Sequence, residues 1–168
     1  MSKNYFYEII FSRVALIIFV IVMFLIMGIA KQPPSTVTVM PSGDFGTKLL
    51  LPDGSIIKTE LADTLEAREK GLSGRNSLDS DASMLFVFDS EGYYDFWMPD
   101  MNFALDMIWM NQNYEIVDIT KDAEPMPGTP LEELPKYKSS APAQFVLEVN
   151  SGFSNEHGLK VGDKLKLT

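Results

Sequence analysis

The sequence predicts a mainly β protein: a single β-sandwich or partly open barrel domain with one or two short helices, preceded by one N-terminal transmembrane helix. Three observations lead to this prediction. Seventeen apolar or small residues follow one another at positions 14–30. From residue 48 onward, short apolar or alternating segments recur at even spacing, with turn residues between them. One short segment among them carries both helix start and helix stop signals.

The apolar run is long enough to cross a membrane. As a helix it covers roughly 26 Å, or about 33 Å when extended back to Ile9, and a hydrocarbon core measures about 30 Å. Arg13 interrupts the longer stretch near one end, where its side chain can reach the lipid headgroups. We therefore predict a signal anchor at residues 9–30 after a short segment, 1–8. The alternatives are a signal peptide cleaved after the small residues at 28–30 and a buried core helix.

The basic residues around this run indicate its orientation. Lys3 and Arg13 precede it, and only Lys31 follows before Lys48. Because basic residues favour the cytoplasmic side, we expect a cytoplasmic N-terminus and an extracytoplasmic domain. The sequence thus predicts a single-pass membrane protein that meets the membrane through residues 9–30.

Composition excludes several classes of function. From residue 31 onward there are 12 Lys and Arg against 22 Asp and Glu, a formal charge of −10. Such an acidic surface repels nucleic acid, so we predict no nucleic-acid partner. The chain has no cysteine, which rules out disulfides, a thiolate nucleophile and a zinc–thiolate site. No metal site and no cofactor are predicted.

The domain begins after a linker. Residues 31–47 contain a double proline that cannot continue a helix, and residues 48–168 are predicted to form the β domain. Its first strands are expected at 48–51 and 55–61. The turn between them, at 52–54, has a proline that presets φ and a glycine that supplies positive φ.

A short helix is predicted at residues 64–70. Asp63 and Glu66 have the spacing of a capping box, and Gly71 is a typical residue just past a helix end. Two leucines are expected to face the core: Leu65 and Leu72.

The remaining segments read as strands and one long loop. Residues 84–88 are wholly apolar, which is typical of a strand covered on both faces. Residues 121–142 hold five of the ten prolines and are predicted to be a surface loop. A helical turn is expected at 154–158. Further strands are predicted at 93–98, 105–110, 115–120, 144–150 and 164–167.

Several short motifs together resemble a known family. They are Gly71-Leu72-x-x-Arg75, Met84-Leu85-Phe86-Val87-Phe88, Phe96-Trp97-Met98, Leu105-Asp106-x-Ile108, Val146-Leu147-Glu148 and Gly162-Asp163. In this order and spacing they resemble the domain of unknown function 192 family, also called uncharacterised protein family 0127, over about Leu49 to Leu167.

The resemblance implies a compact, mostly β domain, often behind a signal peptide or membrane anchor, with no established activity. One departure is visible. Many members carry Lys-Asn-Thr after the FWM motif, where this chain has Pro99-Asp100-Met101. Any role of that lysine in the family is absent here.

Acidic residues within apolar strands are the candidate site. Asp106 lies in FALDMIWM and Glu148 in FVLEVN, and a carboxylate is costly to bury unless it is paired or hydrogen-bonded. In a structural reading, these acids face solvent or pair with Arg75. In a functional reading, they share a cleft with Asp95 or Asp163 and bind a polar ligand, hold a cation, or act as an acid–base pair.

Aromatic residues gather near the same segments. Tyr93, Tyr94, Phe96, Trp97 and Trp109 are either core residues or a platform for sugar rings or apolar groups of a partner. The predicted ligand-binding set is Arg75, Asp95, Trp97, Asp106, Trp109, Glu148 and Asp163.

Three functions remain open at this point. The leading one is a binding or accessory module with an acidic and aromatic face, because no catalytic constellation is recognisable. The second is a hydrolase or lyase acting on cell-envelope polysaccharide, with Asp106 and Glu148 as acid and base. The third is a structural partner subunit of another membrane protein.

Overall fold

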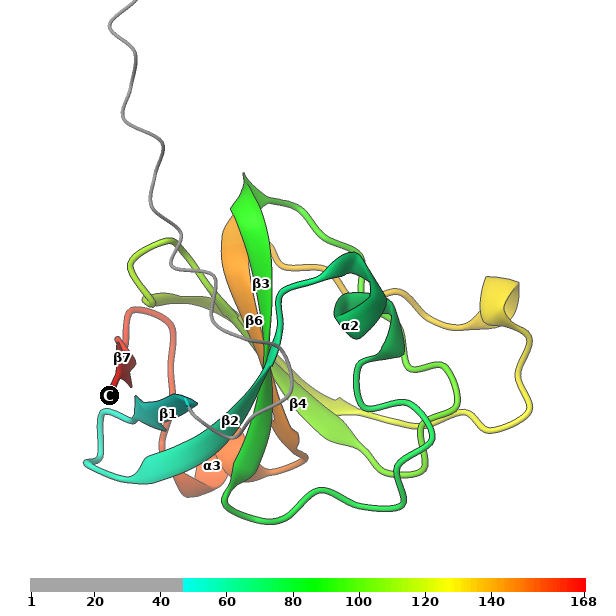
Figure 1. Ribbon diagram of the computed structural model, residues 1–168, viewed down its shortest axis with the longest axis horizontal. Coiled ribbons are helices and arrows are strands. Elements are labelled where there is room, and N and C mark those ends of the chain that lie inside the picture. The colour runs from blue at the N-terminus through cyan, green and yellow to red at the C-terminus, as the bar shows by residue number, and fades with distance from the viewer. Residues whose placement is uncertain (1–46) are drawn as a thin grey trace, which may run out of the picture. The chain divides into compact units, whose positions relative to one another are not determined.

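The computed structural model describes residues 47–168. The predicted membrane helix at 9–30 lies outside the described residues, and so does most of the predicted linker. Across residues 47–168, no helix combines the length and the hydrophobicity that a membrane crossing requires. The described part is mainly β, as predicted: one seven-stranded sheet curls into a half-barrel and carries two short helices (Figure 1).

The strands occur in the spatial order β5-β4-β6-β3-β2-β1-β7. Their bounds are β1 (Thr47–Leu50), β2 (Ile56–Ala62), β3 (Ala82–Gly92), β4 (Leu105–Met110), β5 (Ile116–Ala123), β6 (Ala143–Asn150) and β7 (Lys166–Leu167). Neighbours are antiparallel except β2 and β3, which run parallel. A parallel pair needs a crossover connection, and this one contains α2 (Leu65–Lys70). With one curled sheet, the structure is closer to the predicted open barrel than to a sandwich.

Hydrophobic side chains cover both faces of the sheet. One cluster includes Leu85 and Leu147, and the other includes Phe86, Val146 and Trp109. Successive residues of a strand point to opposite faces, so neighbours in the sequence enter different clusters. This two-sided burial explains why the central strands read as continuous apolar runs.

The start of α2 differs from the prediction by one residue. Thr64 is the N-cap, and its hydroxyl accepts a hydrogen bond from the backbone N–H of Ala67 at 3.1 Å. Asp63, predicted as the cap, lies one position too early, and both residue types can cap a helix. Leu72 is buried as predicted, but Leu65 is 68% exposed, so its predicted core position is wrong.

Gly71 lets α2 end close to the sheet. Its φ is +47°, and its N–H donates to the carbonyl of Ala67 at 2.8 Å. A Cβ at this position would lie 3.2 Å from the ring of Phe86 on β3. Glycine is therefore required both by the backbone conformation and by the close approach of helix and sheet.

The segment 93–98 was predicted as a strand, and that prediction is wrong. It has only an isolated bridge between Phe96 and Tyr137, whose backbone N–H groups donate to each other's carbonyls at 2.8 and 2.7 Å. Tyr137 belongs to the predicted loop 121–142. Beyond Ala123 that loop has the 3-10 turn η1 (Leu131–Glu133), and after β6 comes α3 (Phe153–Glu156).

Candidate functional site

A pocket of about 200 Å³ lies on the sheet face that carries Phe86. Residues of α2 form one side of it and the segment 95–101 forms another; Figure 1 shows α2 over this part of the sheet. An engineered cavity of about 150 Å³ binds benzene, so this pocket has room for a small ligand or one side chain. Its walls are mainly apolar: Leu72, Phe86, Phe88, Phe96, Trp97, Met98 and Met101.

Glu148 lies at the floor of this pocket. Its cross-strand neighbours are Met84 on β3 and Met107 on β4, and its residue surface is 5% exposed. Within residues 47–168, no hydrogen bond or ion pair reaches its carboxyl group, and burial raises the pKa of Glu148 to about 8. Glu148 is therefore mostly protonated at neutral pH.

Three aromatic residues of the walls form a connected set: Phe86, Phe88 and Phe96. Phe96 meets Phe86 and Trp109 edge to face, with ring centroids 4.9 and 5.2 Å apart. Phe88 stacks on Tyr94 at 3.6 Å. Edge-to-face and stacked contacts hold rings in fixed orientations, so the pocket is shaped before any ligand enters.

Both basic and acidic side chains line the pocket. The arginine among them, Arg68, is held in place by hydrogen bonds to the backbone. Arg68 donates from Nη1 to the carbonyls of Asp63 and Val87 at 2.7 and 2.8 Å. Its guanidinium lies 5.3 Å from the centre of the Phe88 ring, within cation–π range. Arg68 thus fixes one end of α2 to β3 and forms part of the wall.

Asp95, a predicted ligand-binding residue, does line the pocket. Its carboxylate lies 3.5 Å from the ammonium of Lys136 and 3.6 Å from that of Lys138. Both lysines come from the loop that follows β5. Asp95 therefore joins the rim of the pocket to this loop through exposed ion pairs.

Asp106 does not share the pocket. On β4 it lies opposite Val149, whereas Glu148 lies opposite Met107. Paired residues of adjacent strands point to the same face and neighbours in one strand to opposite faces, so the carboxyl groups of Asp106 and Glu148 lie on opposite sides of the sheet. The prediction that Asp106 and Glu148 form an acid–base pair in one cleft is therefore wrong.

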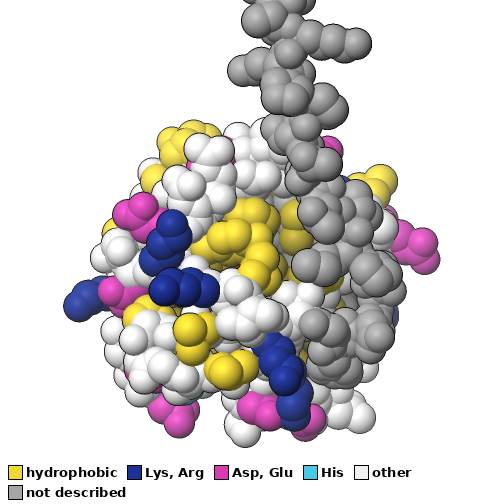
Figure 2. All heavy atoms as spheres, turned by 60° about the vertical axis from the view of Figure 1, so that its left-hand side comes forward, with side chains coloured by type: hydrophobic (Ala, Val, Ile, Leu, Met, Phe, Trp, Pro, Cys, Tyr) yellow, Lys and Arg dark blue, Asp and Glu magenta, His cyan; other side chains and the backbone are white. Residues whose placement is uncertain are grey.

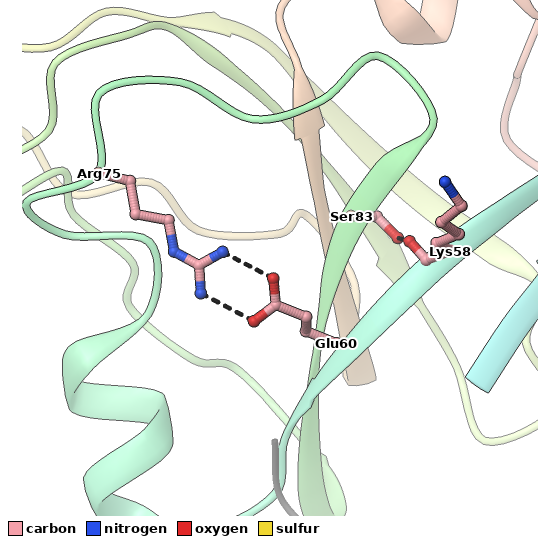
Figure 3. A network of polar contacts seen from close by, with 4 residues as sticks. All are labelled: Lys58, Glu60, Arg75 and Ser83. Carbon is pink, nitrogen blue, oxygen red and sulfur yellow. Dashed lines mark hydrogen bonds and ion pairs between the residues drawn. The ribbon is translucent and has the colours of Figure 1, made fainter. Parts of the chain in front are cut away.

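Arg75 also differs from the prediction. Its guanidinium donates two parallel hydrogen bonds to the Glu60 carboxylate, at 2.6 and 2.8 Å. Figure 3 shows this fork between the segment after α2 and strand β2. Arg75 therefore pairs with Glu60 rather than with Asp106 or Glu148, and it braces the crossover connection.

Arg75→Lys should lower the free energy of unfolding by about 1 kcal/mol and leave the pocket unchanged. A lysine keeps the charge but cannot form the two-pronged contact, and the partial exposure of Arg75 limits the loss. Urea unfolding of the variant measures this effect. Glu60→Gln, which removes the other partner, should give a loss of similar size, whereas unchanged stability in both variants would contradict a bracing role.

The other predicted residues divide between pocket, core and turn. Trp97 is 41% exposed and lines the pocket. Trp109 is fully buried, and its indole N–H donates to the hydroxyl of Thr120 at 3.0 Å. Asp163 accepts from the N–H of Lys160 at 3.1 Å within a turn. Of the predicted ligand-binding set, the pocket thus brings together Asp95, Trp97 and Glu148.

Most wall residues were not predicted as site residues. Phe86 and Phe88 belong to an apolar run that reads as core, and Leu72 was expected to face the core. Phe86 and Phe88 are two positions apart, which places both side chains on one face of β3. No local feature of the sequence shows that α2 leaves a gap above them. Methionines on an aromatic segment, such as Met98 and Met101, were the one available signal of an adaptable surface.

The acidic side chains of the described surface form neither a metal site nor a single patch on the face drawn in Figure 2. Within residues 47–168, no group of three or more His, Asp or Glu side chains has a geometry that could hold a metal ion. On the face drawn in Figure 2, hydrophobic side chains gather near the centre, and the visible acidic side chains are scattered among basic and other side chains around them. The acidic excess is therefore not concentrated in one patch on this face.

The sequence of this domain matches a known protein family. Residues 49–167 match the DUF192 family, described as "Uncharacterized ACR". The chain belongs to the DUF192 family. The resemblance drawn from the motifs is thereby confirmed, over nearly the same residues. A search of curated proteins gives no significant match.

Two solved structures share the DUF192 fold of this chain. One is a Sinorhizobium meliloti protein provisionally assigned as a transcription regulator. It is 28% identical with a TM-score of 0.62, and the similarity covers 72% of this chain and 91% of that one. The other is a protein of unknown function from Novosphingobium aromaticivorans. It is 26% identical with a TM-score of 0.62, and coverage is 71% and 82%. These similarities support the fold of the DUF192 domain.

Proposed function

We propose that this DUF192 domain is a binding or accessory module, and that the pocket above Glu148 is its ligand site. The observation that carries the proposal is a buried carboxyl group without a partner among the described residues, at the floor of a preformed aromatic pocket. Buried polar groups normally have hydrogen-bond partners. A perturbed titratable group in an apolar pocket is a typical mark of a ligand site.

The proposed setting is the outer face of a membrane. If residues 9–30 anchor the chain with its N-terminus in the cytoplasm, the pocket meets components of the cell envelope, including its polysaccharides and neighbouring membrane proteins. A role as partner subunit of a membrane protein is a form of this same proposal. The formal charge of −10 from residue 31 onward does not favour a nucleic-acid ligand.

Hydrolysis by an Asp106–Glu148 pair is not proposed. Two carboxyl groups that cleave a glycosidic bond must flank the same bond, roughly 5–10 Å apart. Asp106 and Glu148 face opposite sides of the sheet, so one substrate cannot lie between them. Without that pair, the geometry of the pocket supports binding better than catalysis.

Trp97→Ala should weaken ligand binding about tenfold or more. Tryptophan is enriched among the few residues that carry most of the binding energy at interfaces, where truncation to alanine costs about 2 kcal/mol or more. The measurement is a screen of the full chain against small aromatic and aliphatic compounds by ligand-observed NMR, followed by affinity measurement in the variant.

Tyr93→Ala is the matched control, because Tyr93 is also an exposed aromatic residue but does not line the pocket. Ligands of the pocket should lose affinity only in Trp97→Ala. If every compound that binds is unaffected by Trp97→Ala and by Glu148→Gln, the pocket is not the binding site and the proposal fails.

A further inference from the structure

We infer that the ligand of this pocket is an organic cation, whose ammonium group meets the Glu148 carboxylate while its apolar part lies against the aromatic walls. The inference rests on the proposed function, since it assigns a ligand class to the same pocket. It draws on three features of the pocket: the unpartnered acid, the aromatic walls and the balanced charges around it.

The first feature is the buried carboxyl group of Glu148, which no described residue partners. Among the described residues, the nearby arginines are already engaged: Arg75 with the Glu60 carboxylate, and Arg68 with two backbone carbonyls. A ligand ammonium brings both a positive charge and three hydrogen-bond donors. An ionised carboxylate in a buried site is stable only with such a partner.

The second feature is the chemistry of the walls. Phe96 and Trp97 line the pocket, and aromatic faces attract cations. The Arg68 guanidinium over the Phe88 ring shows such a contact within this same set. A neutral apolar ligand would use the walls equally well, but it would leave the Glu148 carboxyl group without a hydrogen-bond partner.

The third feature is the balance of the remaining charges. Besides Glu148, the charged residues that line the pocket are Arg68, Glu69 and Lys70 on α2 and Asp95 on the facing segment. Two are basic and two are acidic, so together they do not select a ligand charge. On the sheet, Glu60 lies two strands from Glu148 beyond Met84 and is paired with Arg75. Glu148, at the floor of the pocket, therefore decides the preference for a positively charged ligand.

The proton on Glu148 gives the inference a measurable consequence. Because burial raises the pKa of Glu148 to about 8, a cation that binds at neutral pH must displace that proton to the solvent. Binding should then release close to one proton and strengthen as pH rises. For a single site with this pKa, affinity at pH 6.5 should be roughly 20-fold weaker than at pH 8.5.

The test compares benzylamine with benzyl alcohol, which have nearly the same shape and differ in charge. Both are titrated calorimetrically into the full chain at pH 6.5 and 8.5, in two buffers of different ionisation enthalpy, so that proton release is counted. We expect benzylamine to bind at least tenfold tighter than the alcohol at pH 8.5, with proton release at pH 6.5. In Glu148→Gln, the preference and the proton release should disappear while the alcohol still binds.

Different results separate this inference from the proposed function. If the alcohol binds as tightly as the amine, or the amine releases no proton, the cation inference is overturned and the pocket remains a ligand site. If neither compound binds, the cation inference is overturned, and the compound screen with Trp97→Ala decides whether the pocket is a ligand site. Trp97→Ala checks the location without altering the acid: it should weaken amine and alcohol alike. A parallel titration with Nα-acetyl-lysine methylamide identifies the source of the cation. If this compound binds, the ligand is a lysine side chain of a peptide. If benzylamine binds and this compound does not, the ligand is a small amine.

Discussion

The free energy of unfolding is expected to fall by about 4–5 kcal/mol as pH rises from about 4.5 to 8, because of Glu148 alone. Its ordinary pKa of 4.5 applies to the unfolded chain, and burial raises the pKa to about 8 in the folded domain. Between these values the unfolded chain has lost the proton that the folded domain keeps, so rising pH favours unfolding. Below the window both states are protonated and this stability is fully present; above it the loss is complete.

Urea unfolding at a series of pH values measures this effect, with tryptophan fluorescence as the probe. Trp97 and Trp109 are the only tryptophans of the chain. Glu148→Gln keeps the size of the side chain and cannot ionise, so its stability should be nearly flat over the window. Equal slopes in the wild type and Glu148→Gln would show that Glu148 ionises without penalty.

Other carboxyl groups act outside this window and with the opposite sign. A backbone hydrogen bond from Ser55 and the side chain of His157 lower the pKa of Asp53, and the hydrogen bond with Lys58 lowers the pKa of Asp81. Their stabilisation is present above the ordinary aspartate pKa and is lost as pH falls below it. Ionisation of Glu148 lowers the stability as pH rises above about 4.5, and protonation of these aspartates lowers it as pH falls below their ordinary pKa. The domain should therefore be most stable near pH 4–5.

The sequence predicted the strands because their signals are local. Alternation along 144–150 and the Pro-Asp-Gly turn at 52–54 each depend on residues within a few positions of one another. The error at 93–98 has a physical cause. Aromatic residues that cover a sheet from a loop have the same composition as those that form a strand, and only the pairing of Phe96 with Tyr137 separates the two cases.

The site was harder to predict because its geometry is set by contacts between distant segments. Asp106 and Glu148 carry the same local signal, an acid inside an apolar strand. Whether they share a face depends on the register between β4 and β6, where Asp106 meets Val149. The choice of Glu60 as the partner of Arg75 is likewise set by the crossover connection. Local sequence identified Glu148 as unusual, but it could not separate an acid at the floor of a pocket from an acid held within the fold.

Asp106 is an acid held within the fold, and Asp106→Ala should lower the free energy of unfolding by about 3–5 kcal/mol. Its side chain is fully buried. One carboxylate oxygen accepts from the N–H groups of Asp122 and Gly152 at 3.0 and 3.3 Å. The other accepts from the N–H and the hydroxyl of Ser154 at 2.9 and 2.6 Å. Alanine would leave four donors without an acceptor and a cavity beside them.

Two further variants make this prediction specific. Asp106→Asn keeps the shape but turns one acceptor into a donor that faces Ser154 or Asp122, so a smaller loss of about 2–3 kcal/mol is expected. Asp95→Ala, which removes an acid held by exposed ion pairs, should change stability by less than about 1 kcal/mol. A loss below about 1 kcal/mol in Asp106→Ala would contradict the bracing role.

Because Asp106 lies on the opposite face of the sheet from the pocket, its variants also test whether the two faces act separately. Under conditions where Asp106→Asn is folded, it should bind pocket ligands with wild-type affinity, whereas Glu148→Gln should alter ligand preference with little loss of stability near pH 5. A loss of ligand affinity in folded Asp106→Asn would mean that the brace on one face positions the pocket on the other. The expected separation follows from the sheet itself, whose paired strands fix Glu148 and Asp106 independently of each other's side chains.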